Sequence, residues 1–288
     1  MDEAKCYNLR RRAEIVRAIR SFFDSRGFVE VETSVRIAAP APEAHIDCPP
    51  VATGGFLRAS PELQMKKLVA AGMERIYQIG PCFRDGERGS RHNPEFTMIE
   101  WYRRGATYRD IRADMEQLAA ELGLLAGGQE PGRPATLLVR DAYRRFAGWD
   151  PWASWNQDRF DFDMATRIEP AIKEMGGGVF LSDYPPEAAS LAKLSGTAPD
   201  ACAERWEFYW NGMELANCFT ELCDENEQRR RFEAARAERA ALGEAEYPLD
   251  EEFLASLPKV GSAAGVALGL DRLVMSLLGE SSIAAVRA

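Results

Sequence analysis

The dipeptide Asn211-Gly212 limits the fold of this chain more than any other short segment. It stands between two apolar runs in the sequence RWEFYWNGMELANCFTEL, which covers residues 205 to 222. Asn-Gly favours the two-residue type I′ turn of a β-hairpin, because both residues tolerate a positive φ. The turn predicts these pairs: Trp210 with Met213, Tyr209 with Glu214, Phe208 with Leu215 and Glu207 with Ala216.

This pairing places Glu207 and Glu214 on one face of the hairpin as diagonal neighbours, with backbones about 7 to 8 Å apart. Two carboxylates so arranged can share divalent ions, and magnesium takes carboxylate oxygens together with nucleotide phosphates. The pair therefore suggests Mg-ATP, whereas the alternative is a solvated sheet face with two surface glutamates. Glu221 follows Glu214 by an odd number of residues. It reaches the same face only if a bulge or a strand end lies near residues 216 to 220.

A second hairpin is predicted between Phe83 and Trp101, in the sequence FRDGERGSRHNPEFTMIEW. One strand-like run ends on Arg84, a loop of charges and glycines follows, and a second run returns toward Tyr102. Strand alternation places the following residues on one face: Phe96, Met98, Glu100 and Tyr102. An aromatic ring would then lie beside the Arg84 guanidinium, which suits bidentate recognition of phosphate or carboxylate. The hairpin tip is thus predicted to hold a nucleotide.

Helical periodicity and end signals predict the elements around these hairpins. Helices are expected over residues 7–26, 61–71, 108–125 and 224–242, and a strand over residues 28–33. Ser60 is predicted to cap the second helix, with Pro61 in its first turn. Glu62 also lies in that turn, where it could simply complement the helix dipole. The helix over 224–242 is so highly charged that a solvated face is the simplest interpretation.

Near the C-terminus, the sequence GVALGL predicts a buried strand that ends at Asp271-Arg272, where a helix begins. Glycine in this strand permits a ligand to approach the backbone closely. Arg272 can project from the helix start, where anions bind.

Length and composition favour one domain with an insertion. The chain has 288 residues, of which 46% are hydrophobic, so it can bury a large core. The linker-like sequence AGGQEPGRP opens a stretch, about 126 to 175, that lacks clear periodicity and is interpreted as the insertion.

Charge and cysteine content exclude several classes of protein. A net charge of −9 argues against binding of nucleic acid by bulk electrostatics, although a local basic patch would remain compatible with it. The N-terminal sequence has no apolar signal core and the chain has no run of about 18 apolar residues, so we expect a cytoplasmic protein with no membrane contact. The six cysteines form no CxxC pair. His45 with Cys48 would be at most half a metal site, and buried reduced thiols are the simpler interpretation.

The sequence contains, in this order, an SPE segment, FR followed by HNPEF, then ELANCFTEL and then GVALGLDRLVM. Together these segments resemble the class II aminoacyl-tRNA synthetase core. The resemblance is strongest to lysyl types. Within that family the chain is similar to truncated paralogues that attach β-lysine to elongation factor P, because no anticodon-binding domain precedes the core. The resemblance implies an α+β fold with a mainly antiparallel sheet flanked by helices. It also implies one catalytic domain over residues 1–288 and a homodimer.

By this resemblance Arg84 and Arg272 are the catalytic residues. Arg84 would contact the α-phosphate and the substrate carboxylate, Phe96 would stack on adenine, and Arg272 would hold the triphosphate. The full set implied for ATP is Arg84, Asp85, Gly86, Glu87, His92, Asn93, Phe96, Glu214, Leu215, Gly269 and Arg272. Magnesium would be bound by Glu207 and Glu214. The lysine-type substrate would be met by Ser60, Pro61, Glu62, Tyr102, Asn217, Glu221 and Ala267, with Glu221 pairing with the distant ammonium.

Three positions depart from the lysyl-tRNA synthetase pattern. Ala267 replaces a glycine of the third motif, and its methyl group shrinks the amino-acid pocket, which favours a β-amino acid. The usual Arg-x-Glu of the hairpin reads Arg84-Asp85-Gly86, with Glu87 one residue late as a substitute. Ser34 stands where the first motif has proline, which weakens the dimer-interface assignment, but a homodimer is still expected.

The resemblance implies a two-step reaction that needs ATP and Mg²⁺. A carboxylate would attack the ATP α-phosphorus, and a lysine amine of elongation factor P, not a tRNA, would then attack the adenylate. Two alternatives stay open: a freestanding lysyl-tRNA synthetase paralogue or other tRNA or small-molecule ligase, and a catalytically silent amino-acid sensor. The retained Arg84, Glu207, Glu214 and Arg272 argue against the second.

Overall fold

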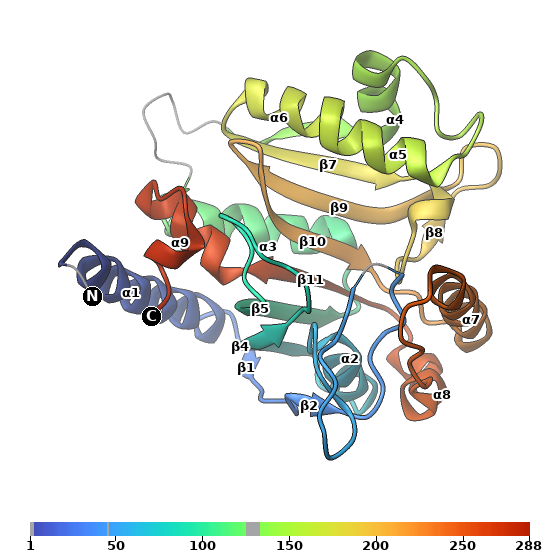
Figure 1. The fold of residues 1–288 in the computed structure, drawn as a ribbon, viewed down its shortest axis with the longest axis horizontal. Coiled ribbons are helices and arrows are strands. Elements are labelled where there is room, and N and C mark those ends of the chain that lie inside the picture. The colour runs from blue at the N-terminus through green and yellow to red at the C-terminus, as the bar shows by residue number, and fades with distance from the viewer. Residues whose placement is uncertain (1–2, 45, 125–132) are drawn as a thin grey trace. The chain divides into compact units, whose positions relative to one another are not determined.

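The computed structural model describes residues 3–44, 46–124 and 133–288 (Figure 1). Its backbone divides into two compact units. The first unit comprises Met1–Gly105, Leu222–Ala263 and Ala267–Ala288, and the second comprises Ala106–Glu221 and Ala264–Val266.

In the first unit, an amphipathic helix precedes a strand, as the periodicity predicts. The helices are α1 (Glu3–Asp24), α2 (Glu62–Ala70), α7 (Glu225–Leu242), α8 (Glu251–Val260) and α9 (Leu270–Leu278), with a short turn η5 (Ile283–Ala285). The strands are β1 (Val29–Glu30), β2 (Arg36–Ile37), β3 (Phe56–Leu57), β4 (Arg75–Phe83) and β5 (Glu95–Arg104). Strand β1 runs parallel to β4, which pairs antiparallel with β5, and β2 pairs with β3. The strand β11 (Ala263–Gly269) has residues in both units.

The second unit holds the Asn-Gly hairpin. Its strands are β6 (Ala135–Leu138), β7 (Gly178–Tyr184), β8 (Leu194–Ser195), β9 (Cys202–Trp210) and β10 (Met213–Thr220). Its helical elements are α3 (Tyr108–Glu121), α4 (Val139–Ala142), η2 (Tyr143–Ala147), α5 (Gln157–Asp163), η3 (Met164–Ile168), α6 (Glu169–Met175) and η4 (Pro186–Ala188). Strand β9 pairs antiparallel with β10, β7 and β8, whereas β6 runs parallel to β7.

The predicted fold class is confirmed: the chain is an α+β protein with a large, mostly antiparallel sheet flanked by helices (Figure 1). The predicted insertion carries a strand and several short helices in its described part, and residues 126–132 lie outside the described residues. The single-domain organisation stays a prediction. Across the described ranges, no helix is both long and apolar enough to cross a membrane.

The β9–β10 hairpin confirms the predicted turn and corrects its register. Asn211 and Gly212 have φ values of 47° and 74°, and the two pairs nearest the turn are those predicted. The register then shifts between Glu214 and Ala216. The predicted pairs Phe208–Leu215 and Glu207–Ala216 are therefore wrong, because Phe208 pairs with Ala216 and Glu207 with Asn217.

The bulge lies between Glu214 and Ala216. The prediction for Glu221 required a bulge or a strand end slightly later, near residues 216 to 220. Leu215 and Ala216, which lie at the bulge, are both buried. Beyond the bulge, Asn217 and Phe219 share the face of Glu207, and Glu221 has the same parity.

Helix boundaries differ by a few residues from those predicted. Helix α2 begins at Glu62, so Pro61 precedes the first helical residue instead of occupying it. The Ser60 hydroxyl nevertheless accepts a hydrogen bond from the Glu62 backbone N–H at 3.0 Å. Helix α7 exposes most of its residues, as its charge predicts, but it buries Arg239 completely. The Arg239 guanidinium contacts Asp47 Oδ1 at 2.6 Å.

A second buried arginine, Arg58, holds the segment that contains Ser34. Its guanidinium donates to the backbone carbonyls of Thr33 (2.9 Å), Ser34 (3.3 Å) and Pro81 (3.2 Å). A Cβ atom on Gly80 would lie 2.8 Å from Arg58 Nη2, so glycine is needed for this close packing. Hydrogen bonds from Arg58 thus join Thr33 and Ser34 to Pro81 of β4. They hold this segment in place although Ser34 stands where the first motif has proline.

We expect Arg58→Met to lower the free energy of unfolding by about 3 kcal/mol, because it removes charge-assisted hydrogen bonds within the core. Urea unfolding followed by circular dichroism measures this change. Arg36→Met is the control, since Arg36 is exposed and bonds only to carbonyls of an exposed loop; its effect should stay within about 0.5 kcal/mol. Equal effects of both substitutions would contradict the structural role of Arg58.

Candidate active site

The β4–β5 hairpin brings Arg84 and Phe96 together in the first unit. Arg84 directly follows β4, and its backbone N–H donates to the Pro94 carbonyl at 2.9 Å, which closes the base of the loop. The Arg84 guanidinium carbon lies 5.2 Å from the centre of the Phe96 ring. Arg84 Nε is buried and lacks a hydrogen-bond partner among the described residues, while Nη1 lies 3.5 Å from Glu87 Oε1. A buried N–H donor with unused capacity, beside an aromatic face, suits a flat anionic ligand such as a nucleotide.

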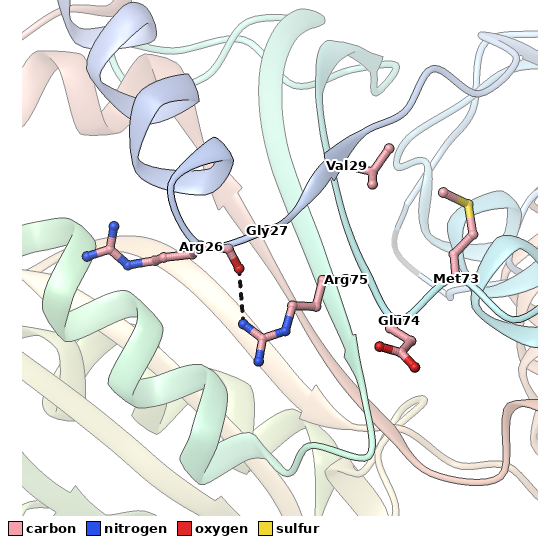
Figure 2. A pocket seen from close by; sticks show the side chains of 6 residues that line it. All are labelled: Arg26, Gly27, Val29, Met73, Glu74 and Arg75. Atoms are coloured by element: carbon pink, nitrogen blue, oxygen red, sulfur yellow. Dashed lines mark hydrogen bonds between the residues drawn. The ribbon is translucent and has the colours of Figure 1, made fainter.

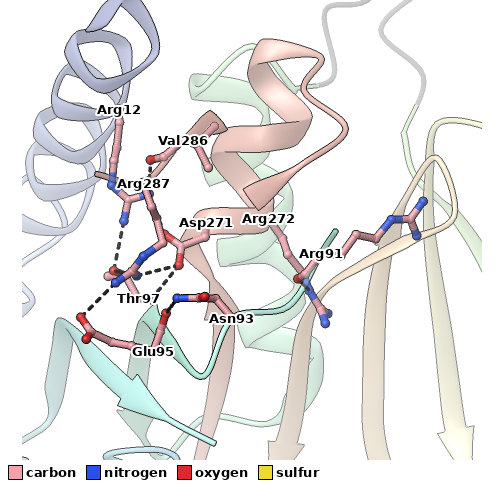
Figure 3. Close-up of polar contacts among 9 residues, drawn as sticks. All are labelled: Arg12, Arg91, Asn93, Glu95, Thr97, Asp271, Arg272, Val286 and Arg287. Atoms are coloured by element: carbon pink, nitrogen blue, oxygen red, sulfur yellow. Dashed lines mark hydrogen bonds and ion pairs between the residues drawn. The ribbon is translucent and has the colours of Figure 1, made fainter. Parts of the chain in front are cut away.

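The loop after Arg84 contains the other predicted nucleotide ligands. Gly86 has a φ of 74°, which glycine adopts readily, and its backbone N–H donates to Asp85 Oδ1 at 3.0 Å. Asn93 Nδ2 donates to the Glu95 carbonyl at 2.5 Å (Figure 3). The Glu87 carboxylate lies near the Arg84 guanidinium, whereas the Asp85 carboxylate bonds the backbone N–H of the next residue.

Arg272 lies at the start of α9 and reaches the same loop. Its Nη2 is 2.5 Å from His92 Nε2, and its Nε donates to the Arg91 carbonyl at 3.4 Å. Partial burial and the neighbouring Arg272 charge lower the pKa of His92, so the imidazole is neutral and can accept the hydrogen bond. Gly269 immediately precedes this helix.

A buried carboxylate fixes the position of the α9 start. Asp271 lies 2.6 Å from Arg12 Nη1 and 3.0 Å from Arg287 Nη1, and it accepts the Thr97 backbone N–H at 2.9 Å (Figure 3). These contacts join α1, β5 and the C-terminal segment beside Arg272. Sequence reasoning missed this role of Asp271, although an acid immediately before a predicted phosphate-binding arginine is a signal for such an anchor.

A polar cluster in the first unit contains the amino-acid residues predicted there. The Ser60 hydroxyl donates to Glu100, and the Tyr102 hydroxyl donates to the other Glu100 oxygen at 3.2 Å. Lys66 Nζ lies 2.5 Å from Glu62 Oε1, and both Lys66 and Glu100 are fully buried. Sequence reasoning placed Glu100 on the face of Tyr102 but gave it no role, and it missed Lys66, which the four-residue spacing from Glu62 could have revealed.

Burial raises the pKa of Glu100 to about 8, and the neighbouring Glu62 carboxylate adds to the rise. A carboxyl group with a pKa of about 8 is largely protonated, and therefore neutral, at pH 7. A further cation beside it would favour the ionised form. The cluster therefore suits a ligand that carries an ammonium group.

The second unit contains Glu207, Glu214, Leu215, Asn217 and Glu221. Glu207 and Glu214 share one face of the β9–β10 hairpin, because Glu214 pairs with Tyr209, two residues from Glu207. The Glu207 carboxylate accepts the Tyr209 hydroxyl at 2.7 Å and lies 2.5 Å from Arg205 Nη2. Glu221 is buried and forms a β-bridge with Ala192.

Glu207 and Glu214 are the two residues predicted to hold a divalent ion. Within residues 3–44, 46–124 and 133–288, no cluster of three or more His, Cys, Asp or Glu side chains could hold a metal. Magnesium, however, commonly takes one or two carboxylates and completes its shell with water and phosphate oxygens. Arg205 and Tyr209 each bond one Glu207 oxygen, and each of these oxygens has a second lone pair, so the Glu207 carboxylate fits this ion.

Cysteines take no part in either group of residues. None of the six cysteines, all of which lie in the described ranges, forms a disulfide bond, and burial raises the pKa of Cys48 to about 11 and that of Cys82 to about 12. The other member of the considered metal half-site, His45, lies outside the described residues.

A surface cavity of about 310 Å³ lies away from these residues in the first unit (Figure 2). It is lined by Arg26, Gly27, Val29, Met73, Glu74 and Arg75. Arg75 donates to the Arg26 carbonyl at 3.1 Å across it. None of the residues that line this cavity is a predicted site residue, so the cavity belongs to neither group of candidate residues.

Comparison with known proteins places the chain in one family. The family model described as "tRNA synthetases class II (D, K and N)" matches residues 2–288. A relative from Proteus mirabilis is 37% identical over 318 aligned positions, covering 99% of this chain and 95% of its own length. Relatives from Vibrio cholerae (36%, covering 100% and 96%) and Edwardsiella ictaluri (38%, covering 98% and 94%) are similar over comparable lengths. All three carry the name "Elongation factor P--(R)-beta-lysine ligase".

These matches extend over nearly the entire chain and agree with the fold and with the order of the sequence motifs. This protein belongs to the class II tRNA synthetase family of the D, K and N type.

Proposed function

We propose that this protein activates β-lysine with ATP as an aminoacyl-adenylate and transfers it to a lysine side chain of elongation factor P. The observation that carries the proposal is the near full-length similarity to relatives named as ligases for that reaction. The unused, buried Nε donor of Arg84 beside Phe96 supports a nucleotide site. The protein is proposed to act as a cytoplasmic homodimer of one catalytic domain, without tRNA.

In the first step, the substrate carboxylate attacks the α-phosphorus of ATP. A P–O bond forms to the carboxylate, the bond to the bridging oxygen of the β-phosphate breaks, and pyrophosphate leaves. No side-chain base is needed, because the attacking carboxylate is already ionised. Arg84 and Arg272 stabilise the charge that develops on the phosphates, and Phe96 orients the adenine.

Two glutamates complete the proposed phosphate site. Glu207 and Glu214 would hold Mg²⁺, which when bound neutralises phosphate charge. The hydrogen bond from Tyr209 and the ion pair with Arg205 keep the Glu207 carboxylate in a fixed orientation.

The amino acid is proposed to bind through its ammonium groups and its carboxylate. Glu62 and Glu100 supply acceptor oxygens, and an ammonium beside Glu100 favours the ionised carboxylate. Glu221 would pair with the distant ammonium, while Asn217 and Tyr102 contribute hydrogen bonds. Ala267 limits the space and so favours β-lysine over α-lysine.

In the second step, the lysine amine of elongation factor P attacks the carbonyl carbon of the adenylate. A C–N bond forms, the C–O bond to AMP breaks, and the amine proton passes to solvent. The product is an amide on the acceptor lysine.

Mass spectrometry of elongation factor P tests the proposal directly. After incubation with this protein, ATP and β-lysine, we expect its mass to rise by one β-lysyl group. Pyrophosphate exchange should also be stronger with β-lysine than with α-lysine. The proposal is wrong if the acceptor mass stays unchanged while α-lysine is attached to tRNA.

Arg84→Met should lower the rate of pyrophosphate exchange about 100- to 1,000-fold, because one electrostatic stabiliser of the reacting phosphate is lost. Steady-state exchange at saturating amino acid measures the effect. Arg88→Met is the matched control, since Arg88 is an exposed arginine of the same loop. Comparable losses in the two variants would show that Arg84 has no special role.

Glu100→Gln should change how stability depends on pH. A carboxyl group whose pKa rises from 4.5 to about 8 on folding contributes stability below pH 4.5 that is lost progressively as pH rises through 8. The wild type should therefore lose melting temperature between pH 5 and 9 more steeply than the variant, which cannot ionise there. Thermal unfolding at a series of pH values checks this. Parallel curves would mean that Glu100 ionises in the folded protein as readily as in the unfolded chain.

A further inference from the structure

Arg205 on β9 contacts two of the proposed site residues at once. Its Nη2 lies 2.5 Å from Glu207 Oε1, and its Nε donates to Asn217 Oδ1 at 3.2 Å. The remaining nitrogen, Nη1, donates to the Ala188 carbonyl at 3.0 Å. Each guanidinium nitrogen therefore has an acceptor of its own, and the planar fork fixes the relative positions of three groups.

Aromatic packing restrains the guanidinium further. Its carbon lies 4.2 Å from the centre of the Tyr184 ring and 5.6 Å from that of Phe219. Tyr184 is fully buried, and the Arg205 side chain itself is only 16% exposed. A cation held between rings and acceptors has little freedom to reorient, so the groups that it bonds share its fixed geometry.

The register of the hairpin explains why one arginine can reach both partners. After the bulge, Asn217 pairs with Glu207, and Phe219 pairs with Arg205. Arg205 and Asn217 are therefore diagonal neighbours on one face, within reach of a long side chain. Without the bulge, Asn217 would point to the opposite face.

The contact also orients the Asn217 amide. Because Oδ1 accepts the hydrogen bond from Arg205, the amide NH₂ remains as the donor end of the side chain. Asn217 therefore presents N–H groups, which suit a carboxylate or carbonyl oxygen of a ligand and not an ammonium.

We propose that Arg205 is a positioning residue that orients the Asn217 amide toward the amino-acid substrate and holds Glu207 in register with it. This inference rests on the proposed function, because it assumes that Asn217 contacts the amino acid. Packing alone does not require an arginine here, because a methionine could fill similar space; the positive charge pairs with the buried Glu207 carboxylate, and the fork bonds Asn217.

A double-mutant cycle between Arg205 and Asn217 tests the proposal. The variants are Arg205→Met, Asn217→Ala and the double substitution. Calorimetry measures the dissociation constant of β-lysine, and pyrophosphate exchange measures its KM and the kcat. We expect Arg205→Met to raise the dissociation constant and the KM about tenfold. The dissociation constant of the double variant should be no more than about twofold above that of Asn217→Ala alone, because Arg205 acts on the amino acid through Asn217.

Two further variants separate positioning from general stability. Arg205→Lys keeps the charge but lacks the fork, so it should recover only part of the affinity. Arg112→Met is the matched control: Arg112 also lies over an aromatic ring, Phe180 at 4.3 Å, and pairs with Glu116, but it contacts no proposed site residue. This control should leave the dissociation constant and the KM unchanged, even if its melting temperature falls.

The outcomes distinguish this inference from the proposed function. If the wild type exchanges pyrophosphate with β-lysine but Arg205→Met keeps its KM and dissociation constant, the positioning role is overturned alone. Multiplicative effects in the double variant would overturn it as well. If the wild type neither binds nor activates any lysine-type amino acid, the proposed function fails and the inference fails with it.

Discussion

A β-strand sends successive side chains to opposite faces, and both groups of candidate residues depend on this constraint. In the β4–β5 hairpin the register runs unbroken from Arg75 to Phe83, so Glu100 and Tyr102 share a face. In the β9–β10 hairpin a single extra residue reverses the alternation. The reversal places Asn217 beside Glu207 and Arg205. The register of each hairpin thus determines which polar side chains of its strands share a face.

Local signals predicted much of this architecture. Asn211-Gly212 identified the turn, and the pairs nearest to it follow directly from its geometry. The bulge could not be predicted in place, because no glycine or proline marks residues 214 to 216 in the sequence. Likewise, alternation placed Glu100 correctly, but its raised pKa comes first from burial and then from the Glu62 carboxylate, which a strand pattern does not reveal.

Long-range polar contacts account for the remaining differences. Arg205 lies near predicted residues in sequence, yet its importance is visible only when its partners are known. Arg239 shows the same effect, since a helix that looks uniformly solvated buries one guanidinium against Asp47. In a chain with a net charge of −9, these arginines are structural components that join separate segments. Composition alone does not reveal which positive charges are internal.

The carboxylate of Asp271 couples three positions that lie far apart in the sequence. It binds Arg12 from the first helix and Arg287 from the C-terminal segment, although these arginines are separated by nearly the whole sequence. Loss of either arginine leaves a buried charge less well compensated, whereas replacing all three residues together removes the charge altogether. Substitutions at positions 12, 271 and 287 are therefore energetically coupled, so the effect of a change at one of them depends on the residues at the other two.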